Sequence, residues 1–378
     1  MLLHGLYFSL LFFLTASTHL WLFCSLVLIG SVASDNVNNS TNARQKRLFS
    51  IFNVVTFKND PCTTTGTGNL GGTCMTSSEC ASKSGSASGN CAAGFGVCCL
   101  FIVSEECGST ITINQNCTYI RNNGNPTPDM TAGQTCTFDF KRICDNLCQI
   151  RLDFRTLSTL VSATGTCGTA EDAVTVSSPF SSSANAFPPT VCGSLTGQHM
   201  YFETGTSGDS AGTLSIAKGT GAGSRTFDIK ATYYTCDNLA KAPPGCTQYF
   251  TGQSGSFQSY NHAGGQLLTD QLYKNCFRQE LGFCRLSLTE SATQTPDPFL
   301  LSAPDAIAES TCDPLSHITV MTPTAAMACG GVLGKDGDTG PATVTTTSGS
   351  FEVGVRSLTA GTAGITGFNL DFEQVACA

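Results

Sequence analysis

A serine set between glycines has the form of a hydrolase nucleophile. Residues 208–212 read Gly-Asp-Ser-Ala-Gly and fit the G-x-S-x-G pattern, which presents a reactive serine hydroxyl on a sharp turn. Such a hydroxyl attacks a carbonyl carbon only when a histidine lies close enough to take its proton. Ser210 is therefore the first candidate for chemistry, and its surroundings decide whether it can react.

The surroundings of Ser210 do not supply that chemistry. A nucleophile elbow follows a buried strand and precedes a helix, whereas residues 204–208 form a turn sequence and residues 212–217 read as a strand. His199 is too close in sequence for the order of a trypsin-like protease, whose G-D-S-G-G motif differs here at one position. The other histidines of the expected mature chain are His262 and His317, and both belong to the second repeat described below. About 0.4 such motifs are expected by chance at this composition. We therefore predict no catalytic residue and no enzyme, and a serine hydrolase is the weakest alternative.

Composition limits the class of protein. The 378 residues include 27 acidic and 19 basic ones, and 12% of residues are charged. A net charge of -8 without a Lys/Arg cluster excludes nucleic acid as a partner, because its phosphates bind basic surfaces. Glycine, serine and threonine are abundant and apolar residues come in short alternating runs, which is typical of strands and turns. We expect an all-β fold and no cofactor.

The N-terminus reads as a secretory signal. Residues 2–29 contain no Asp, Glu, Lys or Arg, and Ser31-Val32-Ala33 supplies the small residues that signal peptidase needs. We predict a signal peptide over 1–33, cleaved near Ala33, and no membrane attachment afterwards. An uncleaved anchor is the alternative, because the apolar stretch is long enough to span a bilayer.

A polar segment follows the signal. Residues 34–47 are too polar to fold and end in Arg-Gln-Lys-Arg, the pattern of secretory convertases, so we predict a disordered propeptide cleaved after Arg47. Asn38, Asn39 and Asn116 begin N-x-S/T sequons and are predicted glycosylation sites, consistent with secretion.

Cysteine is the most informative residue type. Of 21 cysteines, Cys24 leaves with the signal, and the remaining even number is compatible with ten disulfides in an oxidising compartment. The segment 48–101 has the order C-x11-C-x5-C-x10-C-x6-CC and resembles the clip domain of arthropod secreted proteases and their inactive relatives. The resemblance implies the pairs Cys62–Cys98, Cys74–Cys91 and Cys80–Cys99.

The rest of the chain contains an internal repeat. The first copy holds Cys107, Cys136, Cys148, Cys167, Cys192 and Cys236, and the second holds Cys246, Cys276, Cys284, Cys312, Cys329 and Cys377. In both copies the third cysteine precedes an alternating strand, 149–154 or 285–288, and the fifth is followed by glycine. The sixth closes another alternating run, 226–232 or 367–373.

Each repeat resembles the CUB domain, most closely secreted arthropod CUB proteins of unassigned activity. The local support lies at 148–154, 192–201, 242–250 and 367–372. The resemblance implies two antiparallel β-sandwiches in tandem, 102–240 and 241–378, after the small disulfide-rich module. CUB loops commonly carry binding contacts, so it also implies a non-enzymatic secreted protein that binds an extracellular protein or glycan.

The resemblance also implies disulfides. Cys107–Cys136 and Cys246–Cys276 would be the first bonds of their domains, and Cys167–Cys192 and Cys312–Cys329 the second. We infer that Cys148–Cys236 and Cys284–Cys377 join an early strand to the last one, because these cysteines recur together and no other partners remain. Cys117–Cys144 then takes the two left over in the first domain, so that every mature cysteine is bonded.

Many CUB domains bind calcium through a glutamate, an aspartate eight residues later and a further aspartate. Here Thr164 lies eight residues before Asp172, and His317 lies eight residues after Glu309. Calcium requires several oxygen ligands, so these sets are incomplete and we predict no metal site.

Two questions stay open at this point. His199 is either a ligand contact or, as we favour, a structural residue on the polar strand face opposite Met200 and Phe202. The pairs Tyr233-Tyr234 and Tyr249-Phe250 flank the domain junction and form either interdomain packing or an exposed contact surface.

The clip-like segment supports an alternative function as a non-catalytic regulator of an extracellular protease cascade.

Overall fold

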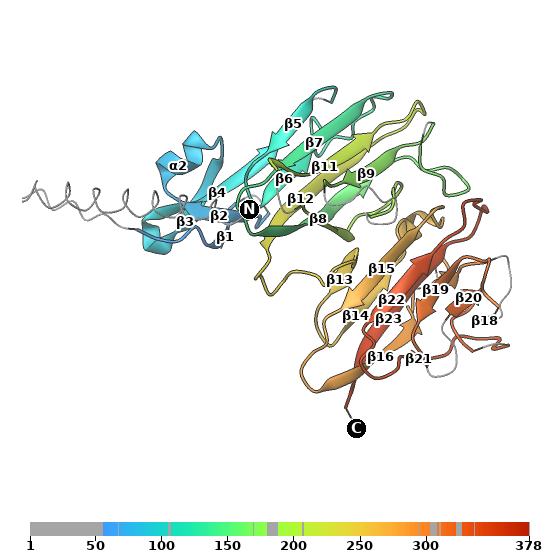
Figure 1. Cartoon of the computed structure of the whole chain (residues 1–378). Helices are drawn as coiled ribbons and strands as arrows, with labels where there is room; N and C mark the ends of the chain where they lie inside the picture. Colours follow the sequence, from blue (N-terminus) through green and yellow to red (C-terminus); the bar gives the residue numbers. More distant parts are fainter. Residues whose placement is uncertain are drawn as a thin grey trace, which may run out of the picture. The chain divides into compact units, whose positions relative to one another are not determined.

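The computed structural model describes residues 56–377, apart from 67, 105–106, 169, 180–187, 206–207, 294, 303–307, 310, 323–326 and 336. The described chain belongs to one compact unit, Val55–Ala378 (Figure 1). The predictions of a signal peptide and propeptide, with Ala33, Asn38, Asn39 and Arg47, lie outside the described residues. The elements of the described chain are mostly strands, which confirms the all-β prediction.

The first part of the described chain is a small disulfide-bonded module. Its elements are β1 (Pro61–Thr63), β2 (Gly71–Met75), α2 (Ser77–Ser82), β3 (Ser86–Cys91), the 3-10 turn Ala92–Gly94 and β4 (Gly96–Val103). Helix α2 begins after Thr76, whose Oγ1 accepts a hydrogen bond from the Glu79 N–H at 3.1 Å. Cys62–Cys98, Cys74–Cys91 and Cys80–Cys99 are bonded, the pairs that the clip resemblance implies. A segment this small buries little apolar surface, so these bonds stabilise it.

Strand β4 connects the module to the first sandwich. It pairs antiparallel with β2 and β3 through residues 96–100, and its last residues, 101–103, pair in parallel with β6 (Thr118–Arg121). The Gly71 N–H also donates a hydrogen bond to the Tyr119 hydroxyl at 2.8 Å. The boundary drawn at residue 101 from the cysteine pattern therefore falls inside a strand, and module and sandwich share one sheet.

The first sandwich packs two sheets face to face. One has the order β6-β12-β8-β10, with β12 (Thr226–Thr235), β8 (Leu147–Ser158) and β10 (His199–Glu203). The other has the order β5-β7-β11-β9, with β5 (Thr110–Ile113), β7 (Thr135–Lys141), β11 (Ser210–Ala217) and β9 (Ala173–Ser177). Phe138 and Phe140 of β7 meet Phe227 and Phe202 of the facing sheet at ring distances of 6.4 and 5.9 Å.

The second sandwich repeats this plan. Its first sheet has the order β13-β15-β22-β19-β20-β18 and its second the order β14-β23-β16-β21, with β17 beside β23. Their bounds are β13 (Gln248–Phe250), β14 (Ser254–Gln258), β15 (Leu272–Phe277), β16 (Phe283–Glu290), β17 (Phe299–Leu300), β18 (Ala308–Glu309), β19 (His317–Val320), β20 (Met327–Gly330), β21 (Val344–Thr345), β22 (Glu352–Arg356) and β23 (Gly367–Ala376). Phe368, Leu370 and Phe372 are buried, as the alternation in this strand predicts.

Disulfides close both sandwiches. The structure contains Cys107–Cys136, Cys148–Cys236, Cys167–Cys192, Cys246–Cys276, Cys284–Cys377 and Cys312–Cys329. Cys148–Cys236 ties the start of β8 to the end of β12 across 88 residues, and Cys284–Cys377 ties β16 to the end of β23 across 93. In each sandwich the two longest central strands are thus covalently joined.

The predicted bond Cys117–Cys144 does not form in the structure, where both cysteines are free thiols. Burial raises the pKa of the Cys117 thiol. Cys144 packs against the main hydrophobic cluster. Pairing the leftover cysteines by elimination therefore gave a wrong prediction.

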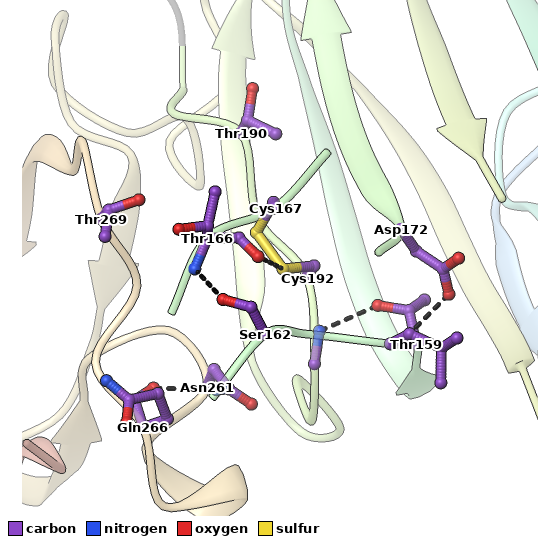
Figure 2. The surroundings of a disulfide bond; sticks show 12 residues. Thr159, Ser162, Thr166, Cys167, Asp172, Thr190, Cys192, Asn261, Gln266 and Thr269 are labelled. Atoms are coloured by element: carbon purple, nitrogen blue, oxygen red, sulfur yellow. Dashed lines mark hydrogen bonds between the residues drawn. A yellow bond between two sulfur atoms is a disulfide. The ribbon is translucent and has the colours of Figure 1, made fainter. Parts of the chain in front are cut away.

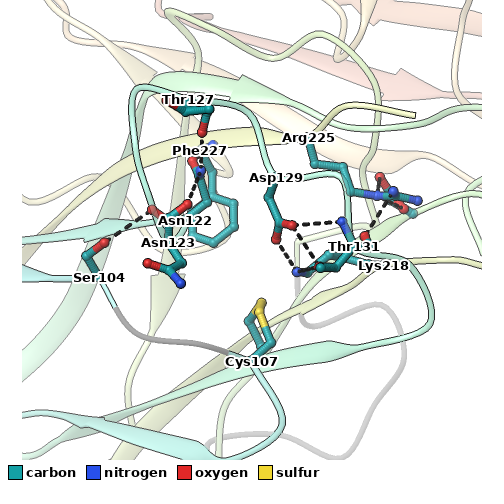
Figure 3. A network of polar contacts seen from close by, with 12 residues as sticks. Ser104, Cys107, Asn122, Asn123, Thr127, Asp129, Thr131, Lys218, Arg225 and Phe227 are labelled. Carbon is teal, nitrogen blue, oxygen red and sulfur yellow. Dashed lines mark hydrogen bonds and ion pairs between the residues drawn. A yellow bond between two sulfur atoms is a disulfide. The ribbon is translucent and has the colours of Figure 1, made fainter. Parts of the chain in front are cut away.

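A buried ion pair fixes one end of the first sandwich. Arg225 Nε donates hydrogen bonds to both carboxylate oxygens of Asp172 at 2.9 and 3.0 Å, and both side chains are almost fully buried. Asp172 also accepts hydrogen bonds from the Leu160 and Gly219 N–H groups. Figure 3 shows Arg225 beside Asp129, Thr131 and Lys218, where the Lys218 ammonium contacts the Asp129 carboxylate. Asp172 is therefore occupied with protein donors.

Removing one partner of the Asp172–Arg225 pair should be costly. We expect Asp172→Ala to lower the free energy of unfolding by about 3–5 kcal/mol, because it leaves a buried guanidinium without its anion. Arg278→Ala is the matched control, since Arg278 is half exposed in its pair with Glu280 and such pairs contribute about 1 kcal/mol or less. Urea denaturation of the disulfide-intact protein measures both, and equal losses would contradict the assignment.

Candidate ligand-binding groove

The second repeat is held against the edge strand β10 of the first. The Gln149 side chain donates to the Ala242 carbonyl and accepts from the Ala242 N–H, both at 2.9 Å. Directly before β13 begins at Gln248, the chain lies along β10, and the Tyr201 N–H donates to the Thr247 carbonyl at 2.7 Å. These bonds fix the path of the chain between the two sandwiches.

His199 is a structural residue of this contact. Its Nε2 accepts a hydrogen bond from the Tyr249 N–H at 2.9 Å, and its carbonyl accepts one from the Tyr260 hydroxyl at 2.9 Å. The ring packs edge-on against Phe250 at 5.1 Å. Burial, and secondarily the charge of Arg151, lowers the pKa of His199 to about 3. The imidazole is therefore neutral at ordinary pH, because only the neutral ring can accept from Tyr249 and remain buried.

The aromatic residues at the junction are interdomain packing. Tyr201 stacks on Tyr234 at 6.0 Å and meets Tyr249 edge-on at 6.3 Å. The Arg151 guanidinium lies over the Tyr201 ring at 5.3 Å. Tyr233 is different, since it is buried in the first sandwich and donates its hydroxyl proton to the Ile113 carbonyl. Of the two alternatives, interdomain packing and an exposed contact surface, the structure shows packing for Tyr234, Tyr249 and Phe250.

The second disulfide of the first sandwich lies at the same contact. Figure 2 shows the Cys167–Cys192 bond with Asn261, Gln266 and Thr269 of the second repeat facing it. Asn261 Oδ1 accepts a hydrogen bond from the Ser194 N–H at 2.7 Å. Gly193 has φ 88°, and a Cβ there would lie 2.1 Å from Asn261 Oδ1. The glycine after the fifth cysteine is thus required by both its conformation and this close approach.

A groove of about 470 Å³ opens beside the junction. Its floor is the outer face of β15, β22 and β19, where Lys274, Gly354 and Thr319 lie side by side on adjacent strands. Gly354 has no side chain to fill the groove, and a Cβ there would lie 3.3 Å from the Thr319 Cβ. Leu272 and Met321 also line the groove, with exposed fractions of 51% and 50%. Large apolar side chains are therefore presented to solvent within a concave surface.

The groove wall comes from the first sandwich. Tyr201, Phe202 and Glu203 of β10 line it together with residues 245–247. Burial raises the pKa of Glu203, against the opposing effects of a 2.5 Å hydrogen bond from Gln149 Nε2 and of the Lys241 charge. On the floor, Lys274 and Glu352 form an exposed ion pair with a Nζ–Oε2 distance of 3.1 Å. The groove therefore combines apolar surface with a half-buried carboxylate.

The residues singled out from the sequence lie elsewhere, apart from His317. Ser210 is the first residue of β11, and its hydroxyl donates to Asp139 Oδ1 at 2.6 Å. His262 Nε2 lies 2.9 Å from the Asp297 carbonyl oxygen. His317 lines the groove, and its Nδ1 lies 2.8 Å from the Leu315 carbonyl oxygen. Leu272, Met321 and Glu203 were not singled out from the sequence. An apolar residue at an exposed position was the only signal that the sequence offered, and it does not show which residues of the other repeat face it across the groove.

Comparison with known proteins supports the fold of the second repeat. The animal CUB domain family matches residues 243–375. Among solved structures, the CUB1-EGF-CUB2 domains of rat MASP-1 match at 14% identity and TM-score 0.25, covering 70% of this chain and 100% of that one. The human MASP-1/3 CUB1-EGF-CUB2 domain matches at 16% identity and TM-score 0.24, covering 68% and 98%. The extracellular region of zebrafish Gpr126/Adgrg6 matches at 8% and 0.26, covering 72% and 37%. No curated protein matched the sequence.

The buried imidazole makes the junction sensitive to acid. The pKa of His199 is about 3 in the folded protein, and its ordinary value, which applies to the unfolded chain, is 6.5. Below pH 6.5 the unfolded chain therefore takes up a proton that the folded chain does not. The free energy of unfolding therefore decreases as the pH is lowered below 6.5, by about 2 kcal/mol at pH 5.

The raised pKa of Glu203 acts in the opposite direction, so the test compares variants. His199→Gln keeps a hydrogen-bond acceptor without a titrating ring, and its stability should lose less between pH 7 and 5 than that of the wild type. Guanidinium unfolding at several pH values measures this difference. Parallel pH profiles of the two proteins would refute the role of His199.

Proposed function

We propose that this is a secreted, non-enzymatic protein that binds an extracellular protein through the groove between its sandwiches. The observation that carries the proposal is the exposure of Leu272 and Met321 in a concave surface that also holds the half-buried Glu203. Apolar anchors beside charged groups are typical of the pockets in which protein side chains bind. A glycan is favoured less, because sugars stack on exposed aromatic faces and Tyr201 is 2% exposed.

An extracellular location is supported by the disulfides. Nine bonds form in the described chain, and bonds of this number persist in oxidising compartments. No helix of the described residues is long and apolar enough to cross a bilayer. We include the signal peptide and the cut after Arg47 in the proposal.

A regulatory role in a protease cascade is the second candidate. It is supported by the three disulfides of the N-terminal module and by Phe95, which is 63% exposed at the turn before β4. In that case the partner would contact the module and not the groove.

Variants of the groove separate these candidates. The secreted protein, carrying a photo-crosslinking residue at Thr319, is irradiated in its source fluid and the captured partner is identified by mass spectrometry. We expect Leu272→Arg and Glu203→Gln each to weaken binding of that partner at least tenfold, about 1.4 kcal/mol. Leu281→Arg is the control, because Leu281 is fully exposed in the turn before β16. Loss of binding with Phe95→Arg but not with Leu272→Arg would favour the regulatory candidate.

The proposal also includes the absence of catalysis by Ser210. Its hydroxyl is engaged with Asp139, which pairs in turn with Lys141 at 2.8 Å, and a carboxylate so paired is a poor base. We expect no labelling of the native protein by a fluorophosphonate probe and unchanged partner binding by Ser210→Ala. Labelling that occurs in the native protein but disappears on heating and in Ser210→Ala would show a true nucleophile.

A further inference from the structure

A second concave surface lies between the N-terminal module and the first sandwich. It has a volume of about 570 Å³, within the range of ligand-sized sites, roughly 300–1,000 Å³. The module contributes Asn59, Pro61, Met75 and Lys83, and the sandwich contributes the turn 114–117 and residues 141–143. We call this surface the module cleft. Its lining is rich in amide and ammonium groups, with a few apolar side chains among them.

Asn116 lines this cleft with a fixed side chain. Its Oδ1 accepts hydrogen bonds from the Cys117 and Tyr233 N–H groups, both at 2.8 Å. Cys117 has φ 61°, so the turn at 115–117 is tight, and the following Thr118 donates its hydroxyl proton to the Gln115 carbonyl at 2.7 Å. Because the carboxamide is planar, anchoring the oxygen directs Nδ2 away from these donors. Within the described residues Nδ2 makes no hydrogen bond of its own.

We propose that Asn116 carries an N-linked glycan whose first sugar lies in the module cleft and bridges the module to the sandwich. The transfer uses a lipid-linked oligosaccharide diphosphate: the sugar C1–O bond breaks, the Nδ2–C1 bond forms, Nδ2 loses one proton and the lipid diphosphate leaves. The carboxamide oxygen is unchanged, so both backbone hydrogen bonds persist after modification. Attachment is thus compatible with the folded turn.

The cleft lining suits a sugar. Hydroxyl and acetamido groups can accept hydrogen bonds from the Lys83 and Lys141 ammonium groups, which approach from the module and from the sandwich. The apolar face of a pyranose ring can pack on Pro61 or the 41% exposed Ile143. A sugar here would contact both parts at once, and the β4–β6 pairing already holds these parts together.

The first test is site occupancy. This inference rests on passage through the secretory pathway, which belongs to the proposed function, so a control sequon is needed. Ala240→Thr creates one at Asn238, in a fully exposed turn remote in sequence from the cleft residues. Glycopeptide mass spectrometry of the secreted variant should find both asparagines modified. Modification of Asn238 alone would overturn the inference and leave the proposed function intact, whereas modification of neither would contradict both.

The second test is protection of the cleft by the first sugar. Hydrogen exchange is compared among protein with the full glycan, protein trimmed to one N-acetylglucosamine, and protein freed of sugar, which carries aspartate at this position. Amides of β2 and of 114–117 should exchange about tenfold faster in the sugar-free form, and the trimmed form should match the full glycan. Asn116→Asp, made directly, should behave as the sugar-free form. Equal exchange in all forms, or a trimmed form that behaves as sugar-free, would overturn the bridging role.

Discussion

Burial of the edge strand β10 is the constraint on which the groove depends. An unpaired strand edge exposes N–H and C=O groups that other chains can bind. Here the Tyr201 N–H donates a hydrogen bond to the Thr247 carbonyl, and His199 Nε2 accepts one from the Tyr249 N–H. The second repeat therefore completes the hydrogen bonding of the first, and the groove forms where β10 meets the outer face of β15. A ligand in it would contact both sandwiches at once.

The module and first sandwich are coupled in a similar way. Strand β4 pairs with β2 on one edge and with β3 on the other, and its last residues, 101–103, pair with β6, so the sheet continues from a disulfide-stabilised segment into a core stabilised by apolar packing. Tyr119 takes part on both sides, since its hydroxyl accepts from Gly71 and its ring lies 5.2 Å from the Arg155 guanidinium. Both neighbours of the first sandwich thus cover one of its strand edges, the module through β4 at β6 and the second repeat at β10.

The sequence allowed the strands and most of the cross-links to be predicted, because both leave local signals. The alternation of Phe368, Leu370 and Phe372 identifies β23. The resemblance to the CUB domain implied the first two bonds of each sandwich, and the recurrence of the remaining cysteines indicated Cys148–Cys236 and Cys284–Cys377. Cys117 and Cys144 belong to no recurrence, and both lie in turns between strands, so nothing local supported the bond that elimination assigned to them. The parallel pairing of β4 with β6 has no local signature either.

The candidate groove was not predictable for a related reason. Glu203 and Leu272 are separated by a linker and four strands, and neither has an unusual neighbour in sequence. His199 was correctly read as structural, but its burial depends on Tyr249 and Phe250 of the other repeat. Arg225 and Asp172 likewise meet only through the fold. Interactions between distant segments carry no periodicity, so composition and spacing do not reveal them.

The long disulfide loops have a consequence for the response of the protein to proteolysis. Any single peptide-bond cut between Cys148 and Cys236, or between Cys284 and Cys377, leaves the two fragments covalently attached. A protease that nicks a loop there would release no fragment, and the damage would be visible only after reduction. The sandwiches can thus persist in a nicked form in fluids rich in proteases, with both halves of each core still held in register.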